Sequence, residues 1–329
     1  MKKILQQLFE QKTLSQAQAR EVILNMAQKK YNEAQLAAFI TVYLMRTISV
    51  DELKGFREAL LELCVPAHFD VPSIDMCGTG GDGKNTFNIS TLASFVVAGA
   101  DYKVTKHGNY GVSSACGSSN VMEYFGYRFT NDMDVLQRQL EQTNICFLHA
   151  PLFHPALKTV GPIRQLLGVK TFFNMLGPLV NPAQPKYQLV GVFNLELARQ
   201  YHYIYQHTEK EYAIIHALDG YDEVSLTSKV AVRSKYEERT LSPFDFGMQT
   251  QQQQDIYGGE TIQESADIFK NILNNEGTTT QNNAVIANAA LGIQCFNPKL
   301  SLSDCVNEAR VALESGKARL GFEKLLQLV

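Results

Sequence analysis

The sequence lacks several features that would place it in a familiar class. No apolar run approaches the roughly 20 residues needed to span a bilayer, and the first seven residues contain neither a long apolar core nor a cleavage site. Its six cysteines are scattered without a CxxC pair, which argues against zinc ribbons and against a disulfide framework. We therefore expect a cytoplasmic protein with reduced, mostly buried thiols.

An excess of one charge is also missing. The formal net charge is -3, so no global field attracts the chain to nucleic acid or to an anionic membrane, and we expect neither as a partner. What the chain does have is length and apolar content: 329 residues, 45% of them hydrophobic. These values are sufficient for a large core and for two domains.

Residues 1 to about 65 have the pattern of a small all-helical domain. Apolar residues recur every three or four positions behind three helix-start signals, in each of which a cap residue is followed three positions later by a side chain that can reach back. The three signals are Ser15 with Gln18, Asn32 with Gln35, and Ser49 with Glu52. Two prolines in residues 65–72 then interrupt the pattern and predict a linker.

From about residue 73 strands alternate with helices, which predicts a larger α/β domain with a mostly parallel central sheet flanked by helices. In such sheets ligands bind beyond the C-terminal ends of the strands. The candidate strands are residues 74–77, 102–105, 145–148, 188–193, 212–217, 223–227 and 230–234.

A glycine-rich loop follows the first candidate strand. Glycines at 78, 80, 81 and 83 allow the backbone to approach a ligand closely, and Asn88 or Ser90 can cap the helix that follows. The helix would present free N–H groups at the loop, an arrangement that suits an anion. The spacing matches neither GxxxxGK[ST] nor GxGxxG, so this loop alone could equally be a tight connection between a strand and a helix.

A second loop makes the functional reading stronger. Residues 106–109, Lys-His-Gly-Asn, follow the next candidate strand, and Gly117 and Ser118 open another helix. Two successive strand ends thus carry residue types that bind phosphate through amides, hydroxyls and an ammonium group. A single phosphate would not need both loops.

These motifs, taken together, resemble the anthranilate phosphoribosyltransferase family. The resemblance covers nearly the whole chain and rests on several signatures in order: residues 78–82 (GTGGD), 88–91 (NIST), 106–109 (KHGN), 112–114 (VSS), 154–156 (HPA), 161–164 (GPIR), 173–178 (FNMLGP), 181–182 (NP), 222–223 (DE) and 288–290 (NAA). It implies transfer of the phosphoribosyl group of 5-phosphoribosyl 1-pyrophosphate to the amine of anthranilate, in tryptophan biosynthesis.

The resemblance also implies a domain organisation. The helical domain of residues 1–68 would be completed by about 155–182, and the α/β domain would comprise residues 73–154 and 183–329. A homodimer is expected from the family as well. Periodicity in the sequence shows neither the interruption nor the dimer.

By family match, a set of residues around the two loops would bind 5-phosphoribosyl 1-pyrophosphate: Gly78, Gly81, Asp82, Thr86, Asn88, Ile89, Ser90, Thr91, Lys106, Ser114 and Ser118. Ser90, Asp222 and Glu223 would be ligands of Mg²⁺, with two ions accompanying the pyrophosphate. Adjacent carboxylates on one strand point to opposite faces, so both can serve only if Asp222 lies in the turn before the strand. Without the resemblance, this acidic pair reads as a solvated turn.

For anthranilate, the family positions are Gly78, His107, Asn109, Arg164, Gly177 and Pro178. Arg164 offers a planar fork suited to a carboxylate, although an arginine taken singly is more often an exposed helix residue. No residue stands out as an obligatory catalytic acid or base, and we do not expect a poorly basic aryl amine to need a strong base before it attacks.

Two residues depart from the family pattern, and two alternatives stay open. Tyr110 stands where the family commonly has arginine, and Asn120 where it has aspartate, so the two changes partly offset in charge.

One alternative is an enzyme like pyrimidine nucleoside phosphorylase. The other is a non-catalytic relative that binds nucleic acid, which would be expected to have a basic stripe and a degraded metal site.

Overall fold

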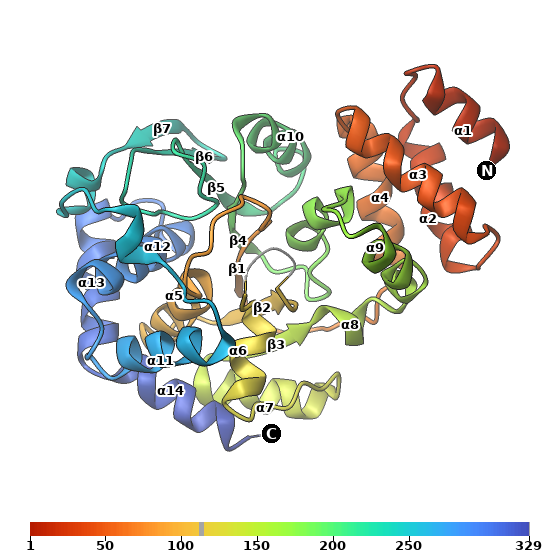
Figure 1. Ribbon diagram of the computed structural model, residues 1–329. Helices are drawn as coiled ribbons and strands as arrows, with labels where there is room; N and C mark the ends of the chain where they lie inside the picture. The colour runs from red at the N-terminus through yellow and green to blue at the C-terminus, as the bar shows by residue number, and fades with distance from the viewer. Residues whose placement is uncertain (112–114, 329) are drawn as a thin grey trace. The chain divides into compact units, whose positions relative to one another are not determined.

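The computed structural model describes residues 1–111 and 115–328. The chain forms two compact units, each built from two separate stretches (Figure 1). Unit 1 comprises Met1–Ala67 and Ala150–Gln184, and unit 2 comprises His68–His149 and Pro185–Val329.

Unit 1 is entirely helical among its described elements. Its first stretch contains α1 (Lys2–Phe9), α2 (Gln16–Ala27), α3 (Glu33–Met45) and α4 (Val50–Leu63). Its second stretch contains α8 (Ala150–Phe153), α9 (Gly161–Leu167) and three short 3-10 helices, η1 (Pro155–Thr159), η2 (Phe172–Met175) and η3 (Gly177–Leu179). The three predicted helix starts are confirmed, because Ser15, Asn32 and Ser49 each form a capping box with the residue three positions later.

The two stretches of unit 1 share one aromatic core. Phe39 and Tyr43 of α3, Phe56 of α4 and Phe172 of η2 pack together with ring centroids 4.9–6.0 Å apart. The backbone also joins the stretches, since the N–H of Val65 donates to the carbonyl of Phe153 at 2.8 Å. Residues far apart in sequence therefore fold as one body through apolar burial and hydrogen bonds.

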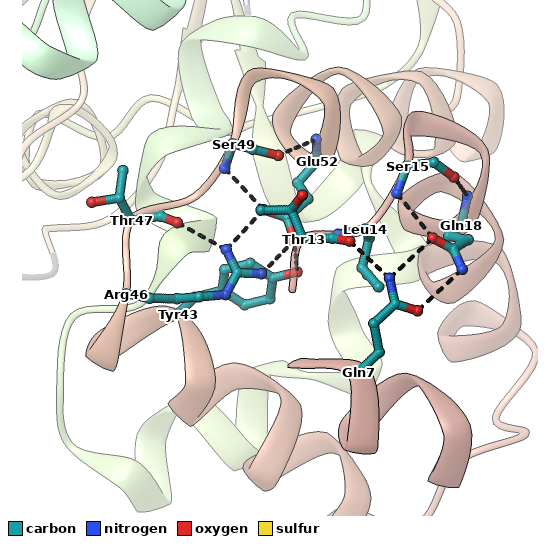
Figure 2. Close-up of polar contacts among 10 residues, drawn as sticks. All are labelled: Gln7, Thr13, Leu14, Ser15, Gln18, Tyr43, Arg46, Thr47, Ser49 and Glu52. Atoms are coloured by element: carbon teal, nitrogen blue, oxygen red, sulfur yellow. Dashed lines mark hydrogen bonds and ion pairs between the residues drawn. The ribbon is translucent and has the colours of Figure 1, made fainter. Parts of the chain in front are cut away.

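A buried carboxylate connects three segments of unit 1 (Figure 2). Glu52 of α4 is 0% exposed, and its oxygens accept hydrogen bonds from the N–H of Leu14 at 2.9 Å, the Tyr43 hydroxyl at 3.0 Å and the N–H of Ser49 at 2.8 Å. The Arg46 guanidinium completes the cluster with an ion pair to the same carboxylate. Burial alone would raise the pKa of Glu52, but the hydrogen bonds and the charge of Arg46 hold it below its usual value.

Unit 2 is an α/β unit. Its strands are β1 (Ile74–Gly78), β2 (Val104–Gly108), β3 (Ile145–His149), β4 (Tyr187–Gly191), β5 (Glu211–Ala217), β6 (Val230–Ser234) and β7 (Glu238–Leu241). Its helices are α5 (Ile89–Gly99), α6 (Ser118–Tyr124), α7 (Met133–Thr143), α10 (Leu195–Tyr205), α11 (Ile262–Leu273), α12 (Thr279–Phe296), α13 (Leu302–Glu314) and α14 (Lys317–Leu326), with η4 (Pro243–Phe246) and η5 (Gln253–Ile256) between β7 and α11.

The strands form one sheet in the order β3-β2-β1-β4-β5-β6-β7. The first five are parallel, and β6 and β7 pair antiparallel at one edge. Helices α5 and α12 pack on one side of the strands and α10 on the other (Figure 1). The predicted α/β class with a mostly parallel sheet is confirmed.

One predicted strand is wrong and one strand was missed. Residues 223–227 form no strand: they belong to the loop between β5 and β6, and Leu226 in that loop has a left-handed φ of 59°. The Asn288 side chain provides the two hydrogen bonds that a neighbouring strand would otherwise make. It accepts from the N–H of Val224 at 3.0 Å and donates to the Val224 carbonyl at 2.9 Å. The short edge strand β7 (ERTL) lacks the alternation of apolar and polar residues from which a strand is predicted.

Among the residues that the structure describes, no helix is both long enough and apolar enough to cross a membrane.

The Glu52 cluster predicts a large effect of a conservative substitution. Glu52→Gln should lower the free energy of unfolding by about 3–5 kcal/mol, because it leaves the buried Arg46 charge without its partner. Urea unfolding followed by circular dichroism measures this value. Glu62→Gln is the control, since Glu62 pairs with Arg20 on the surface and should cost less than about 1 kcal/mol. Equal losses in the two variants would contradict the role given to Glu52.

Candidate functional site

The glycine loop follows β1 and leads into α5. Gly80, Gly81 and Gly83 have φ values of 62°, 81° and 74°, which an L side chain rarely adopts. The N–H of Thr79 donates to the carbonyl of Gly191 at 2.9 Å, so the loop begins against the end of β4. This geometry turns the chain sharply at the C-terminal edge of the sheet.

Asp222 fills the space that two glycines leave open. A Cβ added at Gly78 would overlap the Asp222 carboxylate, and a Cβ at Gly191 would overlap the Asp222 carbonyl. The N–H of Gly80 donates to Asp222 Oδ2 at 2.7 Å. The absence of side chains at the ends of β1 and β4 thus admits a carboxylate that is 7% exposed.

Glu223, the next residue, reaches the start of α5. The N–H of Ser90 donates to Glu223 Oε1 at 2.9 Å, and the Thr86 hydroxyl donates to Oε2 at 3.4 Å. Ser90 lies in the first turn of α5, where free N–H groups and the helix dipole favour negative charge. Both carboxylates belong to a loop and not to a strand, so the alternation of strand side chains does not separate them.

The environment of the two carboxylates disfavours their charged forms. Burial, and then the neighbouring charge of Asp82, raise the pKa of Asp222 above its ordinary value. Burial, and then the charge of Asp222, raise the pKa of Glu223. Two buried acids side by side cannot both ionise easily unless a cation accompanies them.

The metal ligands that the resemblance implies lie around one small cavity. Gly78, Ser90, Asp222, Glu223 and Asn288 line a space of about 10 Å³. Among the described residues no group of three or more His, Cys, Asp or Glu is placed to hold a metal ion. The oxygen donors nevertheless suit Mg²⁺, which keeps most of its shell as water or substrate phosphate and needs few protein ligands.

Two polar atoms near the loop have no hydrogen-bond partner within the described part of the chain. They are Thr79 Oγ1 and Asn88 Oδ1, both buried. Asn88 precedes α5 and its amide donates to the carbonyl of Cys116 at 3.0 Å, so the side chain does not cap the helix as predicted. Because buried polar groups are normally paired, these atoms indicate a site that receives a polar ligand.

Lys106 lies below the loops and not at their tips. The side chain is 1% exposed, and its Nζ donates to the carbonyl of Met76 at 2.5 Å. Burial lowers the pKa of Lys106, while the charges of Cys77, Asp75 and Glu223 oppose that change. The ammonium group therefore balances part of the negative charge at the ends of β1 and β2.

Asp75, near the start of β1, links this strand to both of its neighbours in the sheet. Its Oδ1 accepts from the N–H of His107 at 3.0 Å, and its Oδ2 accepts from Gln188 at 3.3 Å. The side chains of Asp75, Lys106, His107 and Gln188 are all buried. Beneath the candidate site there is consequently a polar layer that links β1, β2 and β4.

The loop after β2 carries several of the remaining predicted residues. The Asn109 carbonyl accepts from the N–H of Ser119 at 3.2 Å and from the Ser118 hydroxyl at 3.3 Å. Asn120 Oδ1 accepts from the N–H groups of Gly111 and Gly117 at 2.9 and 3.0 Å. Ser114, a predicted ligand of the phosphoribosyl substrate, lies outside the described residues.

The two departures from the family pattern also have defined places in this loop. Asn120 provides the acceptor for two backbone N–H groups of the loop without adding a charge. The Tyr110 hydroxyl donates to Glu123 of α6 at 2.7 Å, and that hydrogen bond, together with burial, raises the pKa of Tyr110 to about 12. Tyr110 is therefore a neutral side chain tied to α6.

The other predicted residues divide between the units. Gly81 and Asp82 belong to the glycine loop, and Ile89 and Thr91 are buried in the first turn of α5. The predicted anthranilate residues His107 and Asn109 belong to unit 2, whereas Arg164, Gly177 and Pro178 belong to unit 1.

Arg164 is half-buried in unit 1 and is held by two neighbouring side chains. Its Nη2 donates to Asn174 Oδ1 at 3.0 Å, and its guanidinium carbon lies 5.5 Å from the centre of the Phe173 ring. Burial lowers the pKa of Arg164. Arg164 is therefore a partly buried, oriented guanidinium, and its role in binding anthranilate stays a prediction.

Three residues that shape the site were not assigned a role from the sequence. Gly191 makes room for Asp222, Asn288 holds Val224 beside the carboxylate pair, and Asp75 binds the backbone of β2 at His107. Each contacts a residue more than 30 positions away in the sequence, so the spacing of residues in a local motif does not reveal its role. Asn288 lies in a motif of the family resemblance, which was the one available signal.

Both parts of the chain are similar to known proteins. Residues 2–64 match the family model described as glycosyl transferase family, helical bundle domain, and residues 70–319 match that described as glycosyl transferase family, a/b domain. The anthranilate phosphoribosyltransferase of Flavobacterium psychrophilum is 56% identical to this chain, and that of Christiangramia forsetii is 55% identical. Each comparison covers 100% of this chain and 99% of the relative.

Solved structures are similar over the same length. Anthranilate phosphoribosyltransferase from Thermus thermophilus is 29% identical, with a TM-score of 0.87 over 98% of both chains. The enzyme from Saccharomyces cerevisiae, in complex with PRPP and Mg, is 25% identical, with a TM-score of 0.89 over 98% of this chain and 96% of that one.

Proposed function

Because the chain belongs to the anthranilate phosphoribosyltransferase family, we propose how its own residues carry out the reaction of that family. The enzyme transfers the 5-phosphoribosyl group of 5-phosphoribosyl 1-pyrophosphate to the amine of anthranilate, a step of tryptophan biosynthesis. The products are N-(5-phosphoribosyl)anthranilate and pyrophosphate. The observation that carries the residue assignment is the convergence of the glycine loop, the start of α5 and the acidic pair on one edge of the sheet.

The chemistry demands positioning and charge neutralisation. Aryl amines are weak nucleophiles, and the leaving group is highly charged, so the enzyme must hold the amine close to C1 and stabilise the negative charge that departs. No side chain is assigned as an obligatory acid or base. This division of labour fits a site built from backbone N–H groups, hydroxyls and carboxylates.

Asp222, Glu223 and Ser90 are the proposed protein ligands for magnesium. A bound Mg²⁺ would neutralise phosphate charge and would favour the ionised forms of both acids. The raised pKa values of Asp222 and Glu223 support this assignment, since a cation would relieve the repulsion that burial creates. We propose two ions in the substrate complex, from the family resemblance.

The phosphoribosyl substrate is assigned to the residues around the two loops. The proposed set is Gly78, Gly81, Asp82, Thr86, Asn88, Ile89, Ser90, Thr91, Lys106, Ser114 and Ser118. Thr79 Oγ1 and Asn88 Oδ1, which lack partners in the described residues, support a polar occupant here. The start of α5 adds an electrostatic preference for an anion.

Anthranilate is assigned to Gly78, His107, Asn109, Arg164, Gly177 and Pro178, with Arg164 binding its carboxylate. A guanidinium that is already held by Asn174 and by the Phe173 ring loses little freedom when it binds. We also propose, from the family alone, a homodimer that works in the cytoplasm. The domain limits proposed are 1–68 with about 155–182, and 73–154 with 183–329.

The activity itself is tested directly. Purified protein with Mg²⁺, anthranilate and 5-phosphoribosyl 1-pyrophosphate should consume anthranilate, followed by the loss of its fluorescence. Omission of each component in turn should abolish the signal. Folded protein that shows no turnover at generous substrate concentrations would exclude the proposed reaction.

Asp222→Asn tests the metal assignment. The amide has similar shape but no charge, so the concentration of Mg²⁺ for half-maximal activity should rise about tenfold or more. Asp219→Asn is the matched control, because Asp219 lies in the same loop and accepts from the Ser228 hydroxyl at 2.8 Å. A metal titration that moves equally in both variants, or in neither, would remove Asp222 from the ligand set.

Arg164→Ala tests the anthranilate assignment. Loss of a charged hydrogen bond should raise the KM for anthranilate by about 10- to 100-fold while that for the phosphoribosyl substrate stays within about twofold. Arg164→Lys keeps the charge but loses the planar fork, so its KM for anthranilate should lie between those of the wild type and of Arg164→Ala. If both KM values rose together, Arg164 would have a structural role instead.

A further inference from the structure

Unit 2 contains a second, larger cavity that the proposed reaction does not use. Its volume is about 740 Å³, within the range of small-molecule sites. Its walls come from the first residues of β5, from β6, from the start of β7, from α12 and from the segment that joins α12 to α13 (Figure 1). Because β5 runs parallel to β1, this cavity lies at the N-terminal edge of the sheet, opposite the edge that carries the acidic pair.

A fixed positive charge forms part of the wall. Arg239 of β7 forms an ion pair with Glu237 Oε1 at 3.2 Å and donates a hydrogen bond to the side chain of Gln294 of α12. Its side chain remains 28% exposed. This guanidinium is held both from the turn between β6 and β7 and from α12. Because it is already oriented, it would lose little conformational entropy on binding a ligand carboxylate.

The remaining walls combine both signs of charge with apolar surface. Lys299 is exposed beside the cavity, and Glu211 pairs with Lys235 at 3.2 Å. Between these charged groups lie apolar side chains, which include Val232, Leu291 and Leu300. A ligand with an anionic group, a cationic group and an apolar body could therefore contact a basic, an acidic and an apolar part of the wall, respectively.

We propose that this cavity binds a zwitterionic α-amino acid with a large apolar side chain, and that its occupation regulates the enzyme. The carboxylate would lie against Arg239 and Lys299, the ammonium group would lie against Glu237 and Glu211, and the side chain would cover Leu291 and its neighbours. A simple carboxylic acid would bring no additional cation to Glu237 and Glu211, which already pair with Arg239 and Lys235, and a diamine would bring no anion to Arg239 and Lys299.

Helix α12 connects this cavity to the proposed metal site. Asn288, Leu291 and Cys295 recur at helical spacing and so share one face of the helix. Leu291 and Cys295 line the cavity, whereas Asn288 holds both backbone groups of Val224, the residue after Glu223. The distance along the helix from Asn288 to Cys295 is about 10 Å. A ligand that shifts α12 would therefore move the segment that carries the acidic pair; this coupling rests on the proposed function.

Binding is tested without substrates, so that the result does not depend on turnover. Titration calorimetry of the full chain with L-phenylalanine, L-leucine and L-tryptophan, each with and without excess anthranilate, should show one site that anthranilate does not displace. Glycine lacks the apolar body and 3-phenylpropionate lacks the ammonium group, and each should bind at least about tenfold more weakly. Absence of binding by all three amino acids would overturn the proposal.

Two variants locate the site and test the coupling. Arg239→Gln should weaken binding about tenfold or more, whereas Arg310→Gln, which removes an α13 arginine paired with Glu314 outside the cavity, should leave it unchanged. Equal effects of the two variants would overturn the assigned position. In the anthranilate assay, a saturating amino acid should change the Mg²⁺ dependence of the wild type but not of Arg239→Gln. Binding that left this dependence unchanged would overturn the regulatory role.

Discussion

The burial of the Asp222 carboxylate against glycine backbone is the constraint on which the proposed metal site depends. β1 and β4 are neighbours in the sheet, and both end in glycine, at Gly78 and Gly191. Any side chain at either position would overlap Asp222. The loop after β5 can therefore return across these strand ends, and it delivers Glu223 to the start of α5. Sheet order, two missing side chains and one loop together place the acidic pair.

This arrangement has an electrostatic cost that explains its surroundings. Burial and mutual repulsion raise the pKa values of Asp222 and Glu223, while the buried ammonium group of Lys106 and the first N–H groups of α5 compensate only in part. Isolated charges in such a place are strongly disfavoured. A divalent cation and its phosphate partners would satisfy the oxygens without moving them. Because the two carboxylates repel each other, the site is preorganised for a cation and its phosphate partners.

The sequence is informative where causes are local. Ser15, Asn32 and Ser49 begin helices because a cap and its partner lie three residues apart, and that spacing can be read directly. The alternation of strands and helices similarly predicts the α/β class and the parallel sheet. The glycine loop was recognisable too, since positive φ values at Gly80 and Gly81 require residues without Cβ. The substrates themselves could be inferred only from the family resemblance.

What the sequence could not reveal depends on contacts between distant segments. Asn288 is the one polar residue within the apolar part of α12, residues 284–293, and taken alone it looks like a defect in the core. In the structure its amide binds the N–H and carbonyl of Val224 and so replaces a strand partner at the point where the chain must stay irregular. An apolar residue there would leave two buried backbone groups unpaired, and a true strand would turn Asp222 and Glu223 to opposite faces. Buried polarity on α12 is therefore what allows two consecutive acids to serve one site.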